Sequence, residues 1–194
     1  MGATTHETVV FDVHDFKVWA LIDDLATNAS PTYASVAVDV PGIAEVGLDP
    51  NFITAELKGD AKVMAKKGRI DRFNLSATYG KLAQDVLAVV LGGTVDDSQV
   101  GRSRFRVKGA NSLPYFACAF VIDDADVGQV RVILWKCQVT GGALLSQSTE
   151  EFGQPEMELE GIPAESNSDL FFDVDFLDEA ETLTTATQLA DLAS

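Results

Sequence analysis

The chain has 194 residues, 46% of them apolar, and its 30 Asp and Glu against 14 Lys and Arg give a net charge of -16. This length and apolar content suit one domain with a real hydrophobic core, and the acidic balance argues against tight binding to nucleic acid. The N-terminal residues lack the basic start and apolar run of a secretory signal, and no apolar window reaches the roughly 18 residues of a membrane span. We therefore expect a soluble protein made in the cytoplasm, without membrane anchoring.

Taken in chain order, the first long segment without a regular pattern is a loop over residues 25–41, which contains Ala-Thr-Asn-Ala-Ser-Pro-Thr. After it, apolar and polar residues alternate with period two in segments that Gly, Pro, Asp or Ser separate. These segments are 51–58, 69–79, 103–108, 114–122, 129–139, 155–160 and 169–177. The sequence therefore predicts a mainly β (α+β) fold, an antiparallel β-sandwich or barrel with long loops.

Two of these strands indicate how the layers pack. One face of segment 69–79 consists of Phe73, Leu75, Ala77 and Tyr79, and should meet the core. Segment 114–122 is apolar on both faces and leads through the acidic turn 123–128 into segment 129–139. A strand without a polar face is typical of a hairpin pressed between two layers.

One segment departs from the period of two. In residues 81–91, Leu82, Val86 and Val90 follow a helical spacing, and Gly92-Gly93 then ends the pattern, so we predict one short flanking helix. A weaker helical pattern follows Asp178. We expect a single domain over residues 1–194, with a core over about 9–178 and a loosely docked or mobile acidic tail over 179–194.

Charge is divided into three blocks along the chain. Thirteen of the 14 basic residues lie between Lys58 and Lys136, whereas the last 54 residues hold thirteen acids and no Lys or Arg. A basic middle between acidic ends gives each copy a surface complementary to another copy, so self-association is our first hypothesis. The alternative is a solvated surface without a partner.

The sequence offers no pattern of residues for catalysis, metal binding or a cofactor. His6 and His14 lack an orienting partner, and no zinc, nucleophile or phosphate-loop motif occurs. Cys118 and Cys137 lie in apolar runs and are expected to be small buried hydrophobes rather than a disulfide. A carboxylate-based hydrolase stays an open alternative, but nothing singles out one pair of acids. We predict that the protein is not an enzyme.

Five segments in order carry a resemblance to a known family. They are 40–43 (VPGI), 54–60 (TAELKGD), 71–81 (DRFNLSATYGK), 85–93 (DVLAVVLGG) and 149–155 (TEEFGQP). Together they resemble the major tail tube protein of long, flexible-tailed bacteriophages (siphovirus type), particularly phages of actinobacteria. The resemblance spans about residues 35–165, and the chain departs from the family pattern after about residue 164.

The resemblance implies a structural virion protein with a compact β-sandwich and one flanking helix. Its subunits would form hexameric rings that stack head to tail, with a sheet from each subunit completing a β-barrel around a lumen for genome ejection. The implied partners are other copies of the chain, the tape measure, tail terminator and distal tail proteins, and phage DNA only in transit. The implied location is the virion tail.

Two sets of residues are our candidate sites. Residues 59–68 are predicted to form an extended loop or hairpin that reaches a neighbouring subunit, and the candidate interface is Lys58, Lys62, Lys66, Lys67, Arg69 and Arg72. The candidate lumen or outer-wall face is Glu156, Glu158 and Glu160, which alternate with apolar residues. An acidic wall lets DNA slide, because a basic wall would hold it by many phosphate contacts.

A function from another class stays open. The same alternation of residues allows a monomeric, soluble β-barrel that binds a small apolar ligand. Its pocket would be lined by residues such as Phe116, Phe120 and Trp135.

Overall fold

The computed structural model describes residues 10–59, 62–81, 83–124, 128–143, 153–166, 170–177, 182–185, 187–189 and 192. The strands in these ranges are β1 (Val10–Asp23), β2 (Thr32–Tyr33), β3 (Val38–Asp39), β4 (Ile43–Gly59), β5 (Lys62–Tyr79), β6 (Thr94–Gln99), β7 (Arg102–Arg106), β8 (Phe116–Asp124), β9 (Gln129–Gly141), β10 (Glu156–Gly161) and β11 (Phe172–Leu177). Helix α1 (Gln84–Leu91) follows β5. Every strand pairing is antiparallel in these ranges, so the predicted mainly β class with a short helix is confirmed.

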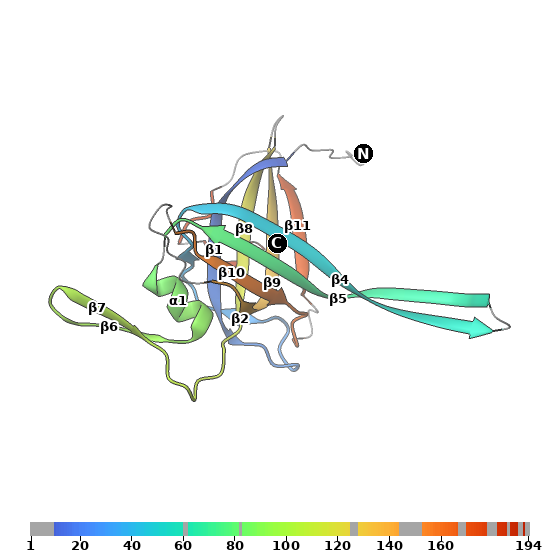
Figure 1. Cartoon of the computed structure of the whole chain (residues 1–194), viewed down its shortest axis with the longest axis horizontal. Coiled ribbons are helices and arrows are strands. Elements are labelled where there is room, and N and C mark those ends of the chain that lie inside the picture. The colour runs from blue at the N-terminus through green and yellow to red at the C-terminus, as the bar shows by residue number, and fades with distance from the viewer. Residues whose placement is uncertain are drawn as a thin grey trace.

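The main sheet has nine strands and divides at β9. Its principal order is β2-β1-β8-β9-β10-β5-β4, with β3 beside β1 and β11 beside β9. The first half of β9 pairs with β11, and its last residues, from Cys137 to Gly141, pair with β10 on the same side. The division brings the β4–β5–β10 layer across the front of the β1–β8–β9–β11 layer (Figure 1).

The main hydrophobic cluster fills the space between these two layers. Leu75, Tyr79, Phe116 and Leu159 are all fully buried there, together with Val90 from α1. The face predicted for segment 69–79 does meet this core. Burial of such side chains contributes about 2 kcal/mol each, so this layer contact is a principal source of stability.

A second hydrophobic cluster lies on the other side of β8 and β9. It contains Trp19, Ala119 and Trp135, and Leu183 and Leu189 from the C-terminal region cover it. Because β8 and β9 are buried on both faces, the prediction of a hairpin between two layers is confirmed.

The described part of the C-terminal tail is docked, which corrects our expectation of a loosely attached segment. Leu183 and Leu189 are only 3% and 1% exposed. The indole nitrogen of Trp19 donates to the carbonyl of Thr187 at 3.0 Å, and the backbone N–H of Ala37 donates to the carbonyl of Thr185 at 2.9 Å. The tail docks because its leucines cover the large side chains of Trp19 and Trp135 and so remove apolar surface from water.

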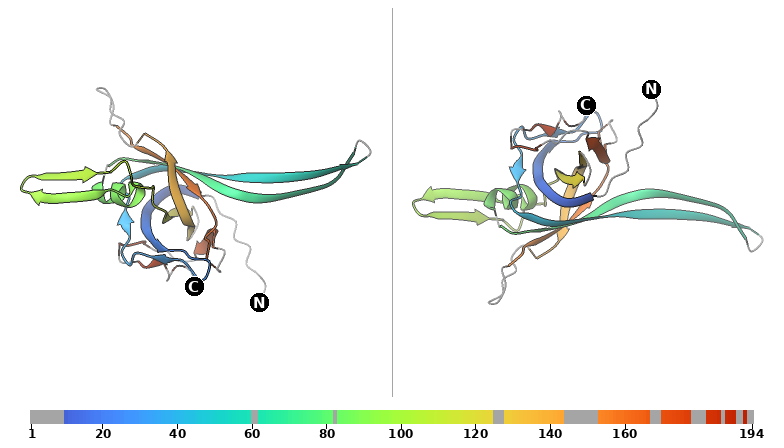
Figure 2. Two further views of the ribbon diagram at one scale, coloured as in Figure 1. Left: turned by 90° about the horizontal axis from the view of Figure 1, so that it is seen from below. Right: turned by 90° about the horizontal axis from the view of Figure 1, so that it is seen from above.

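Strand β1 is absent from our sequence prediction. Its pairing with β8 shifts register twice, and Asp12 and Asp15 adopt positive φ values of 58° and 53° at these bulges. Each bulge adds a residue and increases the local twist, so the alternation of apolar and polar residues is lost in the sequence while β1 curves around the core (Figure 2). Aspartate tolerates the left-handed conformation better than most residues.

Helix α1 begins at Gln84, three residues later than predicted, and ends as predicted at Gly92. Gly92 has φ 69°, and its N–H bonds to the carbonyl of Ala88. Val86 and Val90 are buried against the main cluster, whereas Leu82 of the predicted pattern lies outside the described residues. The helix covers one end of the sandwich and leads directly into the β6–β7 hairpin (Figure 1).

A buried ion pair holds the segment after β10 against the end of β1. Lys136 Nζ lies 2.8 Å from Asp24 Oδ2 and 3.1 Å from Glu165 Oε1, and the side chains of Lys136 and Asp24 are 3% and 5% exposed. The N–H groups of Glu165 and Ser166 also donate to the Asp24 carboxylate. Burial alone would raise the pKa of Asp24, but these hydrogen bonds and Lys136 bring it below its ordinary value. The pair is therefore charged at neutral pH.

Candidate assembly surfaces

The solvent side of the β4–β5–β10 layer carries a set of carboxylates that we name the acidic face. The register of the strands places Glu45, Thr78 and Glu156 side by side. The residues two and four positions away on each strand form two more rows of this kind. The intervening residues, such as Leu75 and Leu159, point into the core. The acidic face consists of Glu45, Asp49, Glu156, Glu158 and Glu160.

The sequence identified only part of this face. Glu156, Glu158 and Glu160 follow one another with period two on one strand, which is a local pattern. Glu45 and Asp49 come from a strand more than 100 residues earlier, and only the register of β4, β5 and β10 brings them alongside. The small residues of the middle strand, such as Ser76, leave the carboxylates exposed.

Arg72 and Glu160, from our two predicted sets, are partners of each other. The Arg72 guanidinium lies 3.0 Å from Glu160 and 2.9 Å from Asp71. Both charges are therefore neutralised within the subunit at the end of the acidic face. Arg72 lies at the base of the β4–β5 ribbon, apart from the exposed Lys66 and Lys67 further out.

Two edges of this layer carry unpaired backbone groups within the described residues. β4 pairs with β5 alone. Beyond Cys137, where the pairing with β8 ends, β9 pairs with β10 alone. The end of β9, β10, β5 and β4 thus form a four-stranded sheet with two open edges, one apolar face in the core and one acidic face in solvent. Open edges are templates for pairing with another chain.

β4 and β5 continue beyond the core as a two-stranded ribbon that we name the long arm, residues 52–59 and 62–70 (Figure 1). At about 3.3 Å per residue, residues 52–59 extend about 26 Å from the body. This ribbon confirms the hairpin alternative of our prediction for residues 59–68. Lys58 pairs with Val63, and Lys62 pairs with Gly59, near the tip of the ribbon. The side chains of these two lysines are outside the described part of the structure.

The long arm exposes both basic and apolar side chains. Lys66 lies 3.3 Å from Glu56 across the ribbon, and Lys67 and Arg69 belong to the opposite face. Its exposed apolar side chains are Phe52, Ile53, Leu57 and Ile70, with exposures from 43% to 63%. Large apolar groups exposed on both faces of an isolated ribbon are typical of a surface that another molecule covers.

The β6–β7 hairpin forms a second projection, which we name the short arm. The two arms extend from opposite sides of the body (Figure 2). Arg104 and Arg106 pair with Asp96 and Thr94, so their side chains and that of Arg102 share one face of the hairpin. Our sequence prediction placed a strand at 103–108 but did not single out this face, although the alternation of arginines is a local signal.

The described residues include no cluster suited to a metal ion. No group of three His, Cys, Asp or Glu could hold a metal ion there. His14 is not isolated as expected, because its ring nitrogen lies 2.9 Å from Asp123 on the neighbouring strand. The thiols of Cys118 and Cys137 are free, buried and 3.8 Å apart. Within these ranges, no helix combines the length and the hydropathy needed to cross a bilayer.

The pocket predicted for a small apolar ligand is not formed by the residues that we proposed. Phe116 and Phe120 belong to the main cluster, whereas Trp135 belongs to the second cluster on the other side of β8 and β9. The three side chains therefore cannot line one cavity. A hollow of about 400 Å³ does lie beside Trp135, with Tyr33 and Leu170 in its wall.

Comparisons with known proteins give a likeness in structure but none in sequence. No protein-family model matches the chain, and no curated protein matches it in sequence. In structure, the chain is similar to the anti-feeding prophage cap, a tube-terminating cap determined by cryo-electron microscopy. The sequence identity is 12% and the TM-score 0.46, over 91% of this chain and 95% of that chain. A likeness of this degree does not establish a shared function.

Proposed function

We propose that this chain is a structural subunit of a phage tail tube. Copies would join side by side into hexameric rings, and the rings would stack head to tail into a hollow tube for genome ejection. The ring, its sixfold symmetry and the lumen are what the resemblance of the five sequence segments to the tail tube family implies. The observation that carries the proposal in the structure is the four-stranded sheet with one buried face, one acidic face and two open edges.

The sheet has the features that a subunit of a closed barrel needs. If the open edge of β4 in one copy pairs with the free end of β9 in the next, each copy adds four strands to a continuous wall. Closing a sheet into a barrel removes the unpaired edges that would otherwise lead to aggregation. The apolar face would stay in each subunit's own core, and the acidic face would line the interior.

An acidic interior suits a conduit for DNA. A carboxylate about 8 Å from a phosphate repels it by roughly 0.5 kcal/mol in water, before screening by salt. Glu45, Asp49, Glu156 and Glu158 from every copy would repeat this weak repulsion around each ring. Glu160 would contribute less, because Arg72 neutralises it.

The long arm supports assembly for a separate reason. It leaves Phe52 and Leu57 in solvent, together with the basic side chains of Lys67 and Arg69, at a distance from the body. Contact with a neighbouring copy would cover these apolar groups and bring the basic side chains near acidic surface. Such a heterologous contact generates rings or open filaments rather than closed dimers.

The test is electron microscopy of the purified chain at low and raised salt, because a net charge of -16 opposes assembly at low salt. Rings or hollow tubes support the proposal. A chain that stays monomeric at every salt concentration and protein concentration contradicts it.

Two variants test the role of the long arm. Deletion of residues 60–67 should leave a folded monomer that forms no tubes. The triple charge reversal Lys66→Glu, Lys67→Glu and Arg69→Glu should also block tube growth with little change in melting temperature, because all three residues are exposed. Normal tubes from the deletion variant would rule out this role of the arm.

The remaining expectations follow from this assignment. The protein would be located in the virion tail, after synthesis in the host cytoplasm. Its partners would be further copies of itself, the tape measure, tail terminator and distal tail proteins, and DNA only in transit. Affinity purification of the chain from infected cells, with mass spectrometry of the co-purified virion proteins, tests this list.

A further inference from the structure

The short arm presents a basic face that the subunit neutralises only in part. Arg102, Arg104 and Arg106 share this face, and in the described part of the chain no carboxylate lies within 4.0 Å of their guanidinium groups. Asp96 is the one acid among the paired residues of this face; it accepts hydrogen bonds from Ser98, and its charge also interacts with that of Arg106. In a chain with net charge -16, three arginines against one aspartate on this face are a local reversal of charge.

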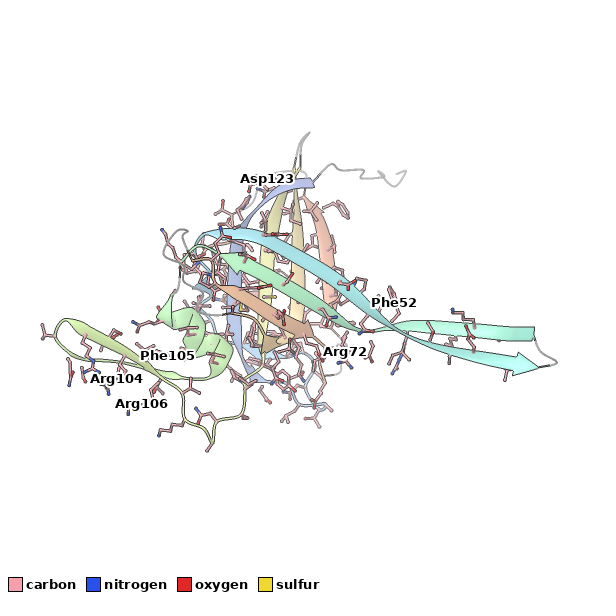
Figure 3. The ribbon with its side chains drawn as sticks, in the orientation of Figure 1. Phe52, Arg72, Arg104, Phe105, Arg106 and Asp123 are labelled. Carbon is pink, nitrogen blue, oxygen red and sulfur yellow. The ribbon has the colours of Figure 1, made fainter. Side chains whose placement is uncertain are left out.

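The orientation of this face is fixed by the packing of the other one. Phe105 lies on the side of the hairpin toward α1, and its ring contacts the backbone at Gly93, where an added Cβ would lie 2.1 Å from the ring. Ser103 bonds to Gln84 at the start of the helix. Arg104 and Arg106 consequently point away from α1, toward the lower side of the molecule in Figure 3.

The opposite end of the body is acidic. Asp12 and Asp15 lie at the two bulges of β1, and Asp123 lies beside them at the end of β8. His14 lies 3.6 Å from Asp15 and 2.9 Å from Asp123, and Lys17 Nζ, 3.8 Å from Asp15, offsets part of the charge there. Asp12 is exposed and makes no ion pair with the described residues. Figure 3 shows Asp123 at the upper end of the body, away from the labelled arginines.

We propose that the arginine face of the short arm binds the acidic end, formed by Asp12, Asp15 and Asp123, of a second copy in the adjacent ring. This inference rests on the proposed tail tube function and names the contact that joins one ring to the next. The two surfaces are opposite in charge and lie at opposite ends of the subunit. The contact is therefore heterologous, and its repetition propagates along an axis without closing.

The other acidic surface is a poorer partner for the short arm. An arm seated on Glu156 and Glu158 of a neighbouring copy would occupy the face that the proposed function leaves open to the lumen. The basic long arm is excluded as partner because like charges would face each other. Binding to the acidic end of the body would neither obstruct the lumen nor bring like charges together.

The first test is charge reversal with assembly as the readout. The double variant Arg104→Glu and Arg106→Glu should still form single rings but raise the protein concentration needed for tube growth by at least about tenfold. Asp12→Asn with Asp15→Asn should act in the same direction without backbone strain, because asparagine tolerates a positive φ. Melting curves of each variant establish that the subunit remains folded.

The second test locates the contact by cross-linking. The variant Arg104→Cys with Asp12→Cys is treated with a short bismaleimide under tube-forming conditions. The native cysteines are fully buried and leave a clean background. The proposal predicts a ladder of covalent multimers from this variant, and no ladder from the control variant Ala29→Cys with Asp12→Cys, which carries the thiol on the exposed loop between β1 and β2.

The outcomes separate this inference from the proposed function. Wild-type tubes together with normal tubes from the arginine double variant, or with no ladder from the cross-linking variant, overturn the contact and leave the tube intact. A wild-type chain that remains monomeric overturns the proposed function and this contact with it. Rings without tubes in the charge variants, together with the ladder, support both.

Discussion

The buried pair between Lys136 and Asp24 provides the sharpest prediction about stability. Asp24→Asn removes the carboxylate but keeps an oxygen that can accept from the N–H of Glu165 or Ser166. Lys136 would then lie buried with Glu165, which is 71% exposed, as its remaining carboxylate, and with the Tyr115 ring 4.8 Å from its Nζ. Loss of one member of a buried pair costs about 3 to 5 kcal/mol, and the remaining exposed partner places this case near 3 kcal/mol. For a chain of this length the melting temperature should fall by about 6 to 12 °C.

A double-mutant cycle isolates the interaction. Lys136→Met preserves most of the side-chain volume and should cost a similar amount, because it leaves the Asp24 carboxylate buried without its cation. The double variant should lose about 2 kcal/mol less than the sum of the single losses, since it leaves no unpaired charge. Denaturant unfolding at neutral pH, followed by tryptophan fluorescence, measures all four free energies.

The pH dependence follows from the two shifts. The pKa of Asp24 is lower in the folded chain than its ordinary value of 3.8, so its contribution is complete above pH 3.8 and disappears as pH falls further. Burial alone would lower the pKa of Lys136, but Asp24 and Glu165 raise it above 10.5, so its contribution is complete below that pH. The cost of Asp24→Asn should be constant between these limits and shrink in acid. Single losses below about 0.5 kcal/mol, or losses that simply add, would refute this account of the pair.

Three further predictions concern other parts of the fold. Gly142→Ala should cost at least about 2 kcal/mol of stability, since Gly142 has φ 106° and a new Cβ would lie 2.4 Å from a backbone oxygen. The control Gly101→Ala, at φ 76° with open space around it, should cost about 1 kcal/mol. Equal losses in thermal unfolding would contradict this difference. Leu189→Ala should cost about 2 to 4 kcal/mol and shift tryptophan emission to the red, and a loss below about 0.5 kcal/mol would mean that the tail is not docked. Cys118 and Cys137 should not react with Ellman's reagent until the chain is denatured, because both are buried and burial raises the pKa of Cys137; rapid labelling of the folded chain would disprove their burial.

The sequence predicted the central strands well because their signal is local. β8 is apolar on both faces, and this pattern is typical of a strand that layers cover on both sides. β1 was missed because the bulges at Asp12 and Asp15 interrupt its period, so Val13 and Phe16, which both pack in the main cluster, are an odd number of residues apart. The first half of β4 was missed for a related reason, because Gly47 and Pro50 are typical of turns rather than strands.

The candidate surfaces were predictable to the extent that each lies on one segment. The alternation of Glu156, Glu158 and Glu160 identified one strand of the acidic face, but Glu45 and Asp49 depend on strand register across the layer. The basic residues of the long arm were recognised as a group. The pairing of Arg72 with Glu160 links two distant segments, and no local pattern could have shown that these charges neutralise each other.

The continuity of the long arm with the β4–β5–β10 layer determines how it responds to force. Both strands of the arm run without a break into the body, where β5 pairs with β10 from Phe73 to Thr78. Tension along the arm would load the β5–β10 hydrogen bonds together in shear, whereas a peeling force would break them one at a time. The register shift between Asn51 and Phe52 lies where the ribbon leaves the body and sets its twist there. A force that a neighbouring copy exerts on the arm is therefore transmitted directly to the β4–β5–β10 layer, because no flexible linker separates the arm from it.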